Sequence, residues 1–382
     1  MPMPQSSGYY IRPIVSLGVD TRREDRRKSE IVSHLCGRPD LVFTHVEVMS
    51  RKHLVPQQRT RWLVRSQGAA GLEHLDMIED VHTVARFKAM HEALVSPRPP
   101  FAGLPMNRTT IMGIVNVTPD SFSDGGRHDQ TQAAIDHALR LAEEGADILD
   151  IGGESTRPGS DAVALEDELR RVIPVIEGLR GKTDKKISVD TRKAQVMRKA
   201  AAAGADILND VSALTHDPKA LETAAAMGLP VMLMHAQGDP KTMNVNPVYD
   251  DVVLDVFDFL ESRIAACVRA GIARDKIVVD PGIGFGKHLH HNVAVLSAMS
   301  LYHALGVPVL LGASRKKLIG QICNVDDPKE RVPGSLAAAL SSVAQGVQIV
   351  RVHDVAATRQ AVSVWHAALA GSEELVGGKR DG

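Results

Sequence analysis

The sequence has few cysteines, and they lie far apart. Its 382 residues include three, Cys36, Cys267 and Cys323, and none of them belongs to a CxxC motif or a His/Cys cluster. This pattern argues against a disulfide framework and against a structural zinc site. Such cysteine usage is typical of a reducing compartment, and we expect a cytoplasmic protein.

Long apolar runs and an excess of charge are also lacking. None of the apolar runs approaches the roughly 18–20 residues that a membrane span needs. The first residues, MPMPQSSGYYIRP, lack the basic region followed by an apolar region that marks a secretory signal. The formal net charge of -1 implies no broad field for nucleic acid or an anionic membrane, so we expect neither as a partner.

Residues 1–105 differ from the rest of the chain in being rich in Arg, His and Pro. Strand-like runs and one helical pattern of apolar residues occur there, at 14–17, 41–48 and 72–93. The prolines at 96–100 predict a linker, because proline cannot continue a helix and stiffens the chain. The basic run at 22–28 contains acidic residues and no aromatic ones, so it predicts a solvated surface. We therefore expect a small α+β extension.

From residue 108 onward, apolar strand candidates alternate with amphipathic helix candidates, each pair taking roughly 25–45 residues. This alternation is typical of βα units that build a parallel sheet. The strand candidates are 111–117, 148–152, 187–190, 207–211, 231–235, 277–280, 309–312 and 349–353. The helix candidates are 132–144, 165–179, 194–203, 219–227, 252–270, 292–300, 334–345 and 355–369.

Eight such units indicate a (β/α)8 TIM barrel, whose typical size is about 250 residues. A doubly wound open sheet is the alternative fold. It would usually carry a glycine-rich dinucleotide fingerprint after the first strand, and this sequence has none there. We expect an extension at 1–105, the barrel at 106–372 and a C-terminal tail at 373–382.

Polar or ionisable side chains stand at the end of almost every predicted strand. In a parallel barrel these C-terminal ends open on one face, where the active sites of barrels lie. Asp190 or Asp210 alone would favour a structural interpretation, as a helix N-cap or a buried polar group. Capping does not easily explain all of them together. The residues are Asn116, Glu154, Thr156, Arg157, Asp190, Asn209, Asp210, His235, Asp280, Ser314, Arg315, Lys316, Arg351 and His353.

These side chains form two chemical groups. Asp190, Asn209 and Asp280 offer acceptors and one amide donor, which suit the edge of a flat, nitrogen-rich heterocycle. Donors suited to a phosphate come from Asn116, Thr156, Ser314, Lys316, Arg351 and His353. A tightly held transition metal would need a His or Cys cluster, which is lacking. Mg²⁺ is compatible, because it keeps its waters and binds mainly through substrate phosphates.

Eight motifs follow one another along residues 111 to about 370. They are NVTPDSFSDGG at 116–126, GGESTRPG at 152–159, SVDTRK at 188–193, LNDV at 208–211, LMHAQGDPKTM at 233–243, DPGIGFGK at 280–287, GASRKKLIG at 312–320 and RVHDV at 351–355. Together they resemble the dihydropteroate synthase family of the folate pathway. One such motif could be accidental, but eight in order are specific. Two small departures, Ile283 and the second lysine Lys317, touch no position expected to be essential.

The resemblance implies a transferase that joins 6-hydroxymethyl-7,8-dihydropterin pyrophosphate to para-aminobenzoate. The products are 7,8-dihydropteroate and pyrophosphate, with SN1-like departure of the pyrophosphate. The resemblance also implies a Mg²⁺ cofactor and a homodimer. Because sulfonamides mimic aminobenzoate, they are the expected inhibitors.

The resemblance further assigns roles to individual residues. The expected pterin-binding residues are Asp190, Asn209, Asp210, Met234, Asp280, Phe285 and Lys316. The expected pyrophosphate-binding residues, which are catalytic together with Lys316, are Arg351, His353 and Asn116, the last also reaching Mg²⁺. The expected aminobenzoate pocket consists of Phe122, Thr156, Arg157, Pro158 and Ser314. The loops after the first two strands are expected to close over the site and exclude water.

Three other functions are weighed against this one. A pterin-dependent methyltransferase on the same barrel would keep the Asp/Asn set but would not need Arg351, His353 or Lys316. A catalytically silent barrel would leave the work to residues 1–105, which contain no recognisable catalytic set. A sulfonamide-insensitive replacement synthase would have an altered aminobenzoate pocket, whereas the DSFSD and ESTRPG stretches are unaltered.

Overall fold

The computed structural model describes residues 8–17, 32–51, 61–67, 71–73, 78, 80–118, 127–155, 160–238, 243 and 245–370. The basic run at 22–28 and the expected tail at 373–382 lie outside the described residues. Among the described helices, none is both long enough and apolar enough to cross a membrane.

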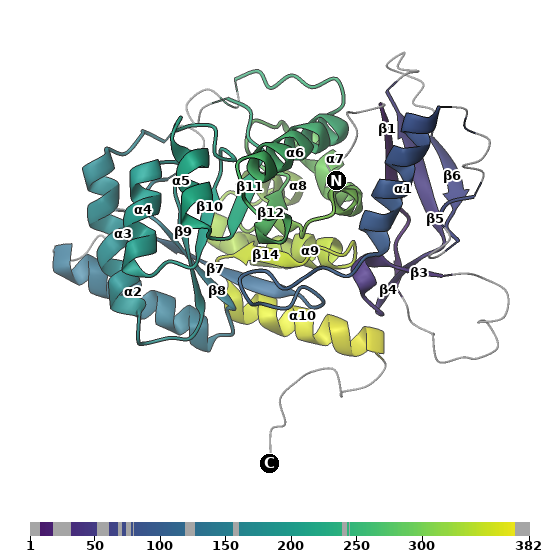
Figure 1. Ribbon diagram of the computed structural model, residues 1–382. Helices are drawn as coiled ribbons and strands as arrows, with labels where there is room; N and C mark the ends of the chain where they lie inside the picture. Colours follow the sequence, from purple (N-terminus) through teal and green to yellow (C-terminus); the bar gives the residue numbers. More distant parts are fainter. Residues whose placement is uncertain are drawn as a thin grey trace.

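An eight-stranded parallel sheet forms the centre of the protein, in the order β12-β11-β10-β9-β8-β7-β14-β13. A parallel bridge between Val279 and Val309 joins the region of β13 back to β12, which closes the sheet. Helices surround it, as Figure 1 shows. The (β/α)8 barrel predicted from the sequence is therefore confirmed.

The barrel strands are β7 Thr110–Asn116, β8 Ile148–Gly152, β9 Lys186–Asp190, β10 Ile207–Asp210, β11 Val231–Met234, β12 Ile277–Asp280, β13 Leu310–Leu311 and β14 Ile349–Val352. The helices are α2 Arg127–Glu143, α3 Leu165–Leu179, α4 Ala194–Ala203, α5 Ala220–Met227, α6 Val252–Arg269, α7 Leu289–Ser297, α8 Lys317–Cys323, α9 Val332–Val343 and α10 Val355–Ala370. Short 3₁₀ helices are η6 Arg274–Lys276, η7 Met299–Leu305 and η8 Pro328–Arg331.

Several helix predictions need correction. The helix predicted at 132–144 begins at Arg127, and α8 at Lys317–Cys323 was not predicted. The helix predicted at 292–300 begins at Leu289 instead, because the side chains of His288 and His291 form a capping box at its start. The helix predicted at 72–93 begins only at Val81, where the Asp80 carboxylate accepts hydrogen bonds from His82 N and Thr83 Oγ1. An aspartate N-cap is a stronger start signal than apolar spacing, since it satisfies orphan backbone donors.

The strands alternate between the barrel interior and the layer beneath the helices, as the two-residue period of a strand requires. Apolar side chains fill the lower interior; they are Met112, Ile148, Ile207, Met232, Val278, Leu310 and Ile349, joined by Phe101 and Met106. Their alternate neighbours along the same strands belong to the larger cluster between sheet and helices. Two residues further along, the inward position is polar on four of these seven strands, at Asp150, Asn209, Asp280 and Arg351, which sets the functional end of the barrel.

The N-terminal part builds two small antiparallel sheets and one long helix against the barrel. Its elements are β1 Tyr9–Pro13, β2 Ser16–Leu17, β3 Ser33–His34, η2 Leu35–Gly37, β4 Leu41–Phe43, β5 His45–Ser50, β6 Arg61–Arg65 and α1 Val81–Val95. The sheets have the orders β1-β5-β6 and β2-β4-β3. This region lies beside α6 and α7 in Figure 1, and its core is continuous with that of the barrel. The predicted α+β character is confirmed.

The stretch 96–100, predicted as a linker, is packed at this junction. Arg98 is buried, and its Nη2 donates a hydrogen bond to His303 O at 2.8 Å. A Cβ on Gly37 would lie 2.7 Å from Pro97 Cγ, which shows how closely η2 packs against the prolines. The segment is therefore a fixed part of the junction.

Candidate functional site

Strand register places predicted site residues of neighbouring strands at one level. Asn116 pairs with Gly152, Gly152 pairs with Asp190, and Asp190 pairs with Asn209. On the next strands, Met234 pairs with Asp280. All of these lie at the C-terminal ends of their strands, the face where barrel enzymes bind their substrates.

At this level of the barrel interior, a buried polar network connects β8, β9, β10 and β14. Arg351 donates from Nε to Asp150 Oδ2 at 2.7 Å and from Nη2 to Asp190 Oδ2 at 2.9 Å. Asn209 Nδ2 donates to the same Asp150 oxygen at 3.2 Å. Burial raises the pKa of Asp190 to about 7, although Arg351 opposes the shift. The network therefore holds an arginine between two carboxylates.

Asp150 is a residue that the sequence reasoning missed. It is fully buried in the middle of β8, and its Oδ1 has no protein hydrogen-bond partner among the described residues. The inward-facing hydroxyl of Ser188 on β9 is likewise without one. A carboxylate inside the otherwise apolar run 148–152 was the available signal, because such a charge is costly unless it serves a partner.

Across the barrel interior from β8 and β9, Lys316 and Asp280 lie close together. The pKa of Lys316 is lowered to about 8 by burial, although Asp280 opposes the shift. The ammonium donates to Ile283 O and lies 4.5 Å from the centroid of the Phe285 ring. Asp280 Oδ1 accepts from Gly282 N at 2.7 Å. A cation, a carboxylate and an aromatic face thus meet in one place.

A second buried lysine, Lys287, also escaped the sequence reasoning. Its Nζ donates to Gly282 O at 2.9 Å and Phe285 O at 3.2 Å, and it lies 2.9 Å from His235 Nδ1. Burial lowers its pKa to about 7. Gly282 has a φ of 71°, and a Cβ there would collide with the carbonyl of His235. Lys287 and Gly282 therefore fix the loop that carries Phe285.

The residues expected to bind pyrophosphate lie on β7, on β14 and directly after β14. Ser314 Oγ accepts from His353 N at 3.1 Å and lies 3.1 Å from His353 Nδ1. Asn116 ends β7 with a partly exposed side chain. Arg315, in contrast, is held by Asp354, with Nε 2.9 Å from Oδ2. Arg315 therefore has a structural role.

Glu154, at the end of β8, belongs to a supporting ion network. Its carboxylate pairs with Arg192 at 2.5 Å and with Lys193. Lys193 also pairs with Glu168 at 2.5 Å, and Thr191 Oγ1 donates to Glu168 Oε1. This network ties the loops after β8 and β9 together.

Asp210, which the resemblance places in the pterin group, has its side chain engaged by the turn after β10. Successive strand residues point to opposite faces, so Asp210 faces away from the interior that Asn209 faces. Its Oδ1 accepts from Ser212 N and Ser212 Oγ, both at 2.6 Å, and its Oδ2 accepts from Leu214 N at 3.1 Å. Asp210 therefore caps the turn after β10.

Much of the expected aminobenzoate pocket lies outside the described residues. Phe122, Thr156, Arg157 and Pro158 fall in the ranges 119–126 and 156–159, which are not described. Ser314 is the member of that group whose place is given. The roles of the other four stay predictions.

A cavity of about 360 Å³ adjoins this group of site residues. It is formed by the loops after β9, β10, β11 and β12 together with one side chain of α6. Its lining consists of Arg192, Val211, Ser212, Thr215, His216, Ala236, Gly238, Met243, Phe259 and Phe285. Phe285 belongs both to this cavity and to the group around Lys316, so the cavity extends the same site.

Comparison with known proteins agrees with this geometry. The sequence model described as pterin binding enzyme matches residues 112–353. Dihydropteroate synthase of Escherichia coli K12 is 50% identical over 270 residues, which are 71% of this chain and 95% of that protein. The chain belongs to the dihydropteroate synthase family. Its members are transferases, and their pterin-binding barrel is the barrel described above.

Solved structures of the family superpose on the same part. Dihydropteroate synthase of Xanthomonas albilineans with 4-aminobenzoic acid is 54% identical, with a TM-score of 0.67, and covers 70% of this chain and 97% of its own. The Yersinia pestis dihydropteroate synthase with a sulfonamide drug complex is 49% identical, with a TM-score of 0.66, and covers 69% and 96%. Nearly the whole length of these relatives is matched, and the family model leaves residues 1–111 of this chain outside.

Proposed function

We propose that this chain catalyses the reaction of its family, the condensation of 6-hydroxymethyl-7,8-dihydropterin pyrophosphate with para-aminobenzoate in folate biosynthesis. The observation that carries the proposal is the ring formed by Asp190, Asn209, Asp280, Lys316 and Arg351 at the C-terminal ends of the strands. It combines acceptors for a heterocycle edge with cations for an anionic leaving group. A new bond forms between the arylamine nitrogen and the pterin methylene carbon, and that nitrogen releases one proton to solvent. Pyrophosphate leaves with the electron pair of the broken C–O bond.

The pterin would be held by its hydrogen-bonding edge. Asp190 and Asp280 accept from its N–H groups, and Asn209 supplies both an acceptor and a donor. The phenyl ring of Phe285 packs near the pterin. Lys316, which lies over that phenyl ring, donates a hydrogen bond to the pterin. Met234, at the register level of Asp280, supplies an apolar contact.

The pyrophosphate would be held by Arg351, His353 and Asn116. In the structure Arg351 is paired with two carboxylates, so its charge is pointed into the site before any phosphate arrives. A departing pyrophosphate gains charge as the C–O bond breaks, and fixed cations stabilise that charge most in the transition state. This arrangement supports an SN1-like departure, because the pterin can delocalise the positive charge left behind.

A Mg²⁺ ion fits this arrangement. The described residues contain no group of three His, Cys, Asp or Glu side chains suited to a metal ion. Mg²⁺ needs no such group, because it keeps several waters and binds through substrate phosphates. Asn116 would supply one oxygen ligand, and the ion would neutralise pyrophosphate charge. We further propose a cytoplasmic homodimer and inhibition by sulfonamides at the aminobenzoate pocket.

The alternative functions are weaker. A methyltransferase on the same barrel would have no use for Arg351 with His353, whose neighbours Asp150, Asp190 and Ser314 hold them in place. A silent barrel would not need to keep a partly buried arginine between two buried carboxylates, which costs desolvation energy.

Pyrophosphate release by the purified full-length chain tests the proposal. It is measured with the dihydropterin pyrophosphate and Mg²⁺, in the presence and absence of para-aminobenzoate. We expect release that depends on the arylamine, with dihydropteroate formed in equal amount. A folded protein that shows no arylamine-dependent release would contradict the proposal.

A further inference from the structure

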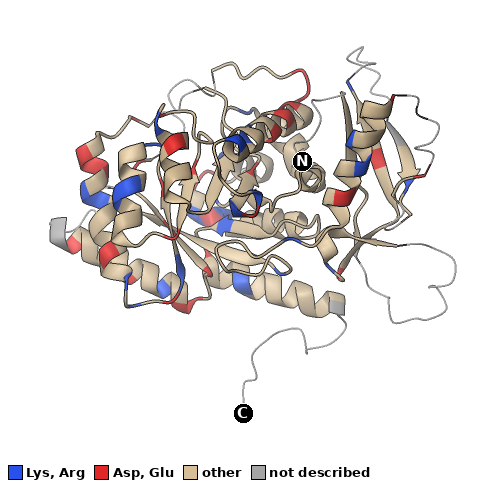
Figure 2. Cartoon of the chain, in the orientation of Figure 1, with Lys and Arg blue, Asp and Glu red and all other residues tan. Residues whose placement is uncertain are grey.

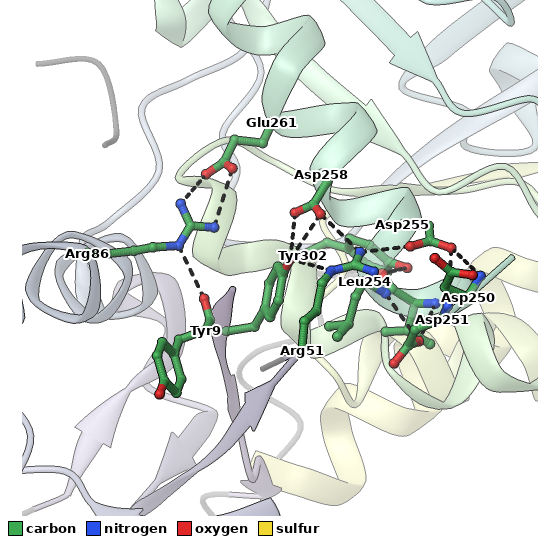
Figure 3. A network of polar contacts seen from close by, with 12 residues as sticks. Tyr9, Arg51, Arg86, Asp250, Asp251, Leu254, Asp255, Asp258, Glu261 and Tyr302 are labelled. Atoms are coloured by element: carbon green, nitrogen blue, oxygen red, sulfur yellow. Dashed lines mark hydrogen bonds and ion pairs between the residues drawn. The ribbon is translucent and has the colours of Figure 1, made fainter. Parts of the chain in front are cut away.

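Helix α6 has an acidic side that faces the N-terminal part of the chain. Asp255, Asp258 and Glu261 are spaced three residues apart, so they lie along one face of the helix. Tyr10, Arg51 and Arg86 approach this face from β1, from the residue after β5 and from α1. Figure 2 shows acidic colouring on α6, and Figure 3 shows Arg51 and Arg86 directed at its carboxylates. We call these six residues the clamp: Tyr10, Arg51, Arg86, Asp255, Asp258 and Glu261.

The clamp is specific in its geometry. Arg51 Nη2 lies 2.7 Å from Asp255 Oδ1 and 3.0 Å from Asp258 Oδ2. Arg51 Nε donates to Tyr10 Oη at 2.8 Å, and Tyr10 Oη donates to Asp258 at 2.9 Å. Arg86, whose side chain is fully buried, grips Glu261 with two bonds of 3.0 and 3.3 Å. Paired hydrogen bonds to an arginine fix orientation as well as distance.

A neighbouring side of α6 forms part of the wall of the cavity described above. Phe259 lines the cavity and packs edge-on against His235, with ring centroids 4.9 Å apart. Arg263 Nε donates to Ala213 O at 2.9 Å, in the loop that supplies Val211 and Ser212 to the cavity. A shift of α6 would therefore move both the cavity wall and this loop.

The clamp also reaches the loop after β11. Asp255 Oδ2 accepts from Asp250 N at 3.0 Å and Asp251 N at 3.2 Å, at the end of that loop. Just before them, Tyr249 Oη donates to Gly286 O at 2.7 Å, next to Phe285. Arg51 is thus connected, through Asp255, to the chain segment that meets the Phe285 loop.

We propose that the N-terminal part positions the pterin side of the site, with Arg51 as a positioning residue that acts through Asp255 and α6. The identity of the ligand rests on the function proposed above. Arg51 contacts Tyr10, Asp255 and Asp258, none of which belongs to the ring of site residues. Its effect on binding would therefore pass through the helix.

Binding of 6-hydroxymethylpterin to the full-length chain, followed by its fluorescence well below the melting temperature, tests this proposal. Arg51→Gln removes the pair, and Arg51→Lys keeps a cation. Arg180→Gln is the matched control, because Arg180 and Asp206 form a pair of similar exposure, 2.6 Å apart, at the opposite ends of the strands. Melting temperatures are measured for all variants.

We expect Arg51→Gln to raise the Kd for the pterin about five-fold or more, a size typical of coupling through packed elements. Arg51→Lys should restore most of the affinity, and Arg180→Gln should bind like wild type even where its melting temperature falls. Equal Kd values for Arg51→Gln and Arg180→Gln would overturn the proposal and leave Arg51 as a stabilising residue. If wild type itself fails to bind the pterin, the ligand assignment fails, and this inference falls with it.

Discussion

Asp150 and Arg351 form an ion pair across the barrel interior, with Arg351 Nε 2.7 Å from Asp150 Oδ2. The aspartate is fully buried, so its charge is compensated chiefly by this guanidinium and by the amide of Asn209. A buried carboxylate with such partners fixes the direction in which the arginine points. The pair therefore aims the cation that we assign to pyrophosphate.

Asp150→Asn tests this role. The amide keeps the size of the side chain but removes the charge that orients Arg351, so we expect turnover to fall by roughly 10- to 10²-fold. Turnover is measured beside circular dichroism and melting temperature. Asp147→Asn is a suitable control, because Asp147 pairs with Arg108 and Arg359 away from the site. Wild-type turnover in Asp150→Asn would show that Arg351 does not need the Asp150 carboxylate.

Lys316→Ala and Arg351→Ala test the charge-stabilising residues themselves. Each removes a cation that we place against the substrate, and loss of one such stabilising group costs roughly 10²-fold or more in turnover. Both variants should remain folded by circular dichroism. Near-wild-type turnover in either variant would exclude the role assigned to that residue.

The affinity for the pterin should depend on pH through Asp190 and Lys316. Asp190 has a pKa of about 7 in the folded protein, and its ionised form accepts hydrogen bonds from pterin N–H groups. Lys316 has a pKa of about 8, and only its protonated form is a cation. Affinity should therefore rise as the pH passes 7 and fall as it passes 8.

Titration of the pterin Kd against pH checks this expectation. Asp190→Asn should remove the rise on the acidic side, and Lys316→Arg should move the fall to higher pH, because arginine keeps its proton. A profile that is flat from pH 6 to 9 in wild type, a window of about one unit beyond each pKa, would contradict the assignment.

Arg86→Met tests the contribution of the clamp to stability. It leaves the Glu261 carboxylate largely buried without its partner, and breaking a buried pair from one side costs about 3 kcal/mol or more. Urea unfolding measures the free energy. The double variant with Glu261→Leu should recover much of the loss, since two apolar side chains replace the pair. If Arg86→Met lowers the free energy of unfolding by less than about 1 kcal/mol, the pair contributes no more than a surface ion pair does.

The barrel could be predicted because its signals are local. Apolar, β-branched runs set the strands, and polar side chains at the strand ends marked the functional face. The strand expected at 309–312 is reduced to Leu310–Leu311, since apolar character alone does not set strand length. The start of α7 was missed, because capping by His288 depends on side-chain geometry rather than on an apolar period.

The rest of the site depends on contacts between distant parts of the chain. Asp150 was missed because attention to strand ends passes over a carboxylate inside a strand. Lys287 was missed because two of its three partners are backbone carbonyls, which leave no mark in the sequence. The hydrogen bond between Tyr10 and Asp258 joins residues 248 positions apart, so no local sequence pattern predicts it.

A crystal structure of the full-length chain with 6-hydroxymethylpterin would test the central claim most directly. The account predicts density for a flat ring beside Phe285, with its edge against Asp190, Asn209 and Asp280 and with Lys316 in contact. Density confined to the part of the cavity near Thr215, His216 and Met243, with the ring residues untouched, would contradict the assignment of the pterin site.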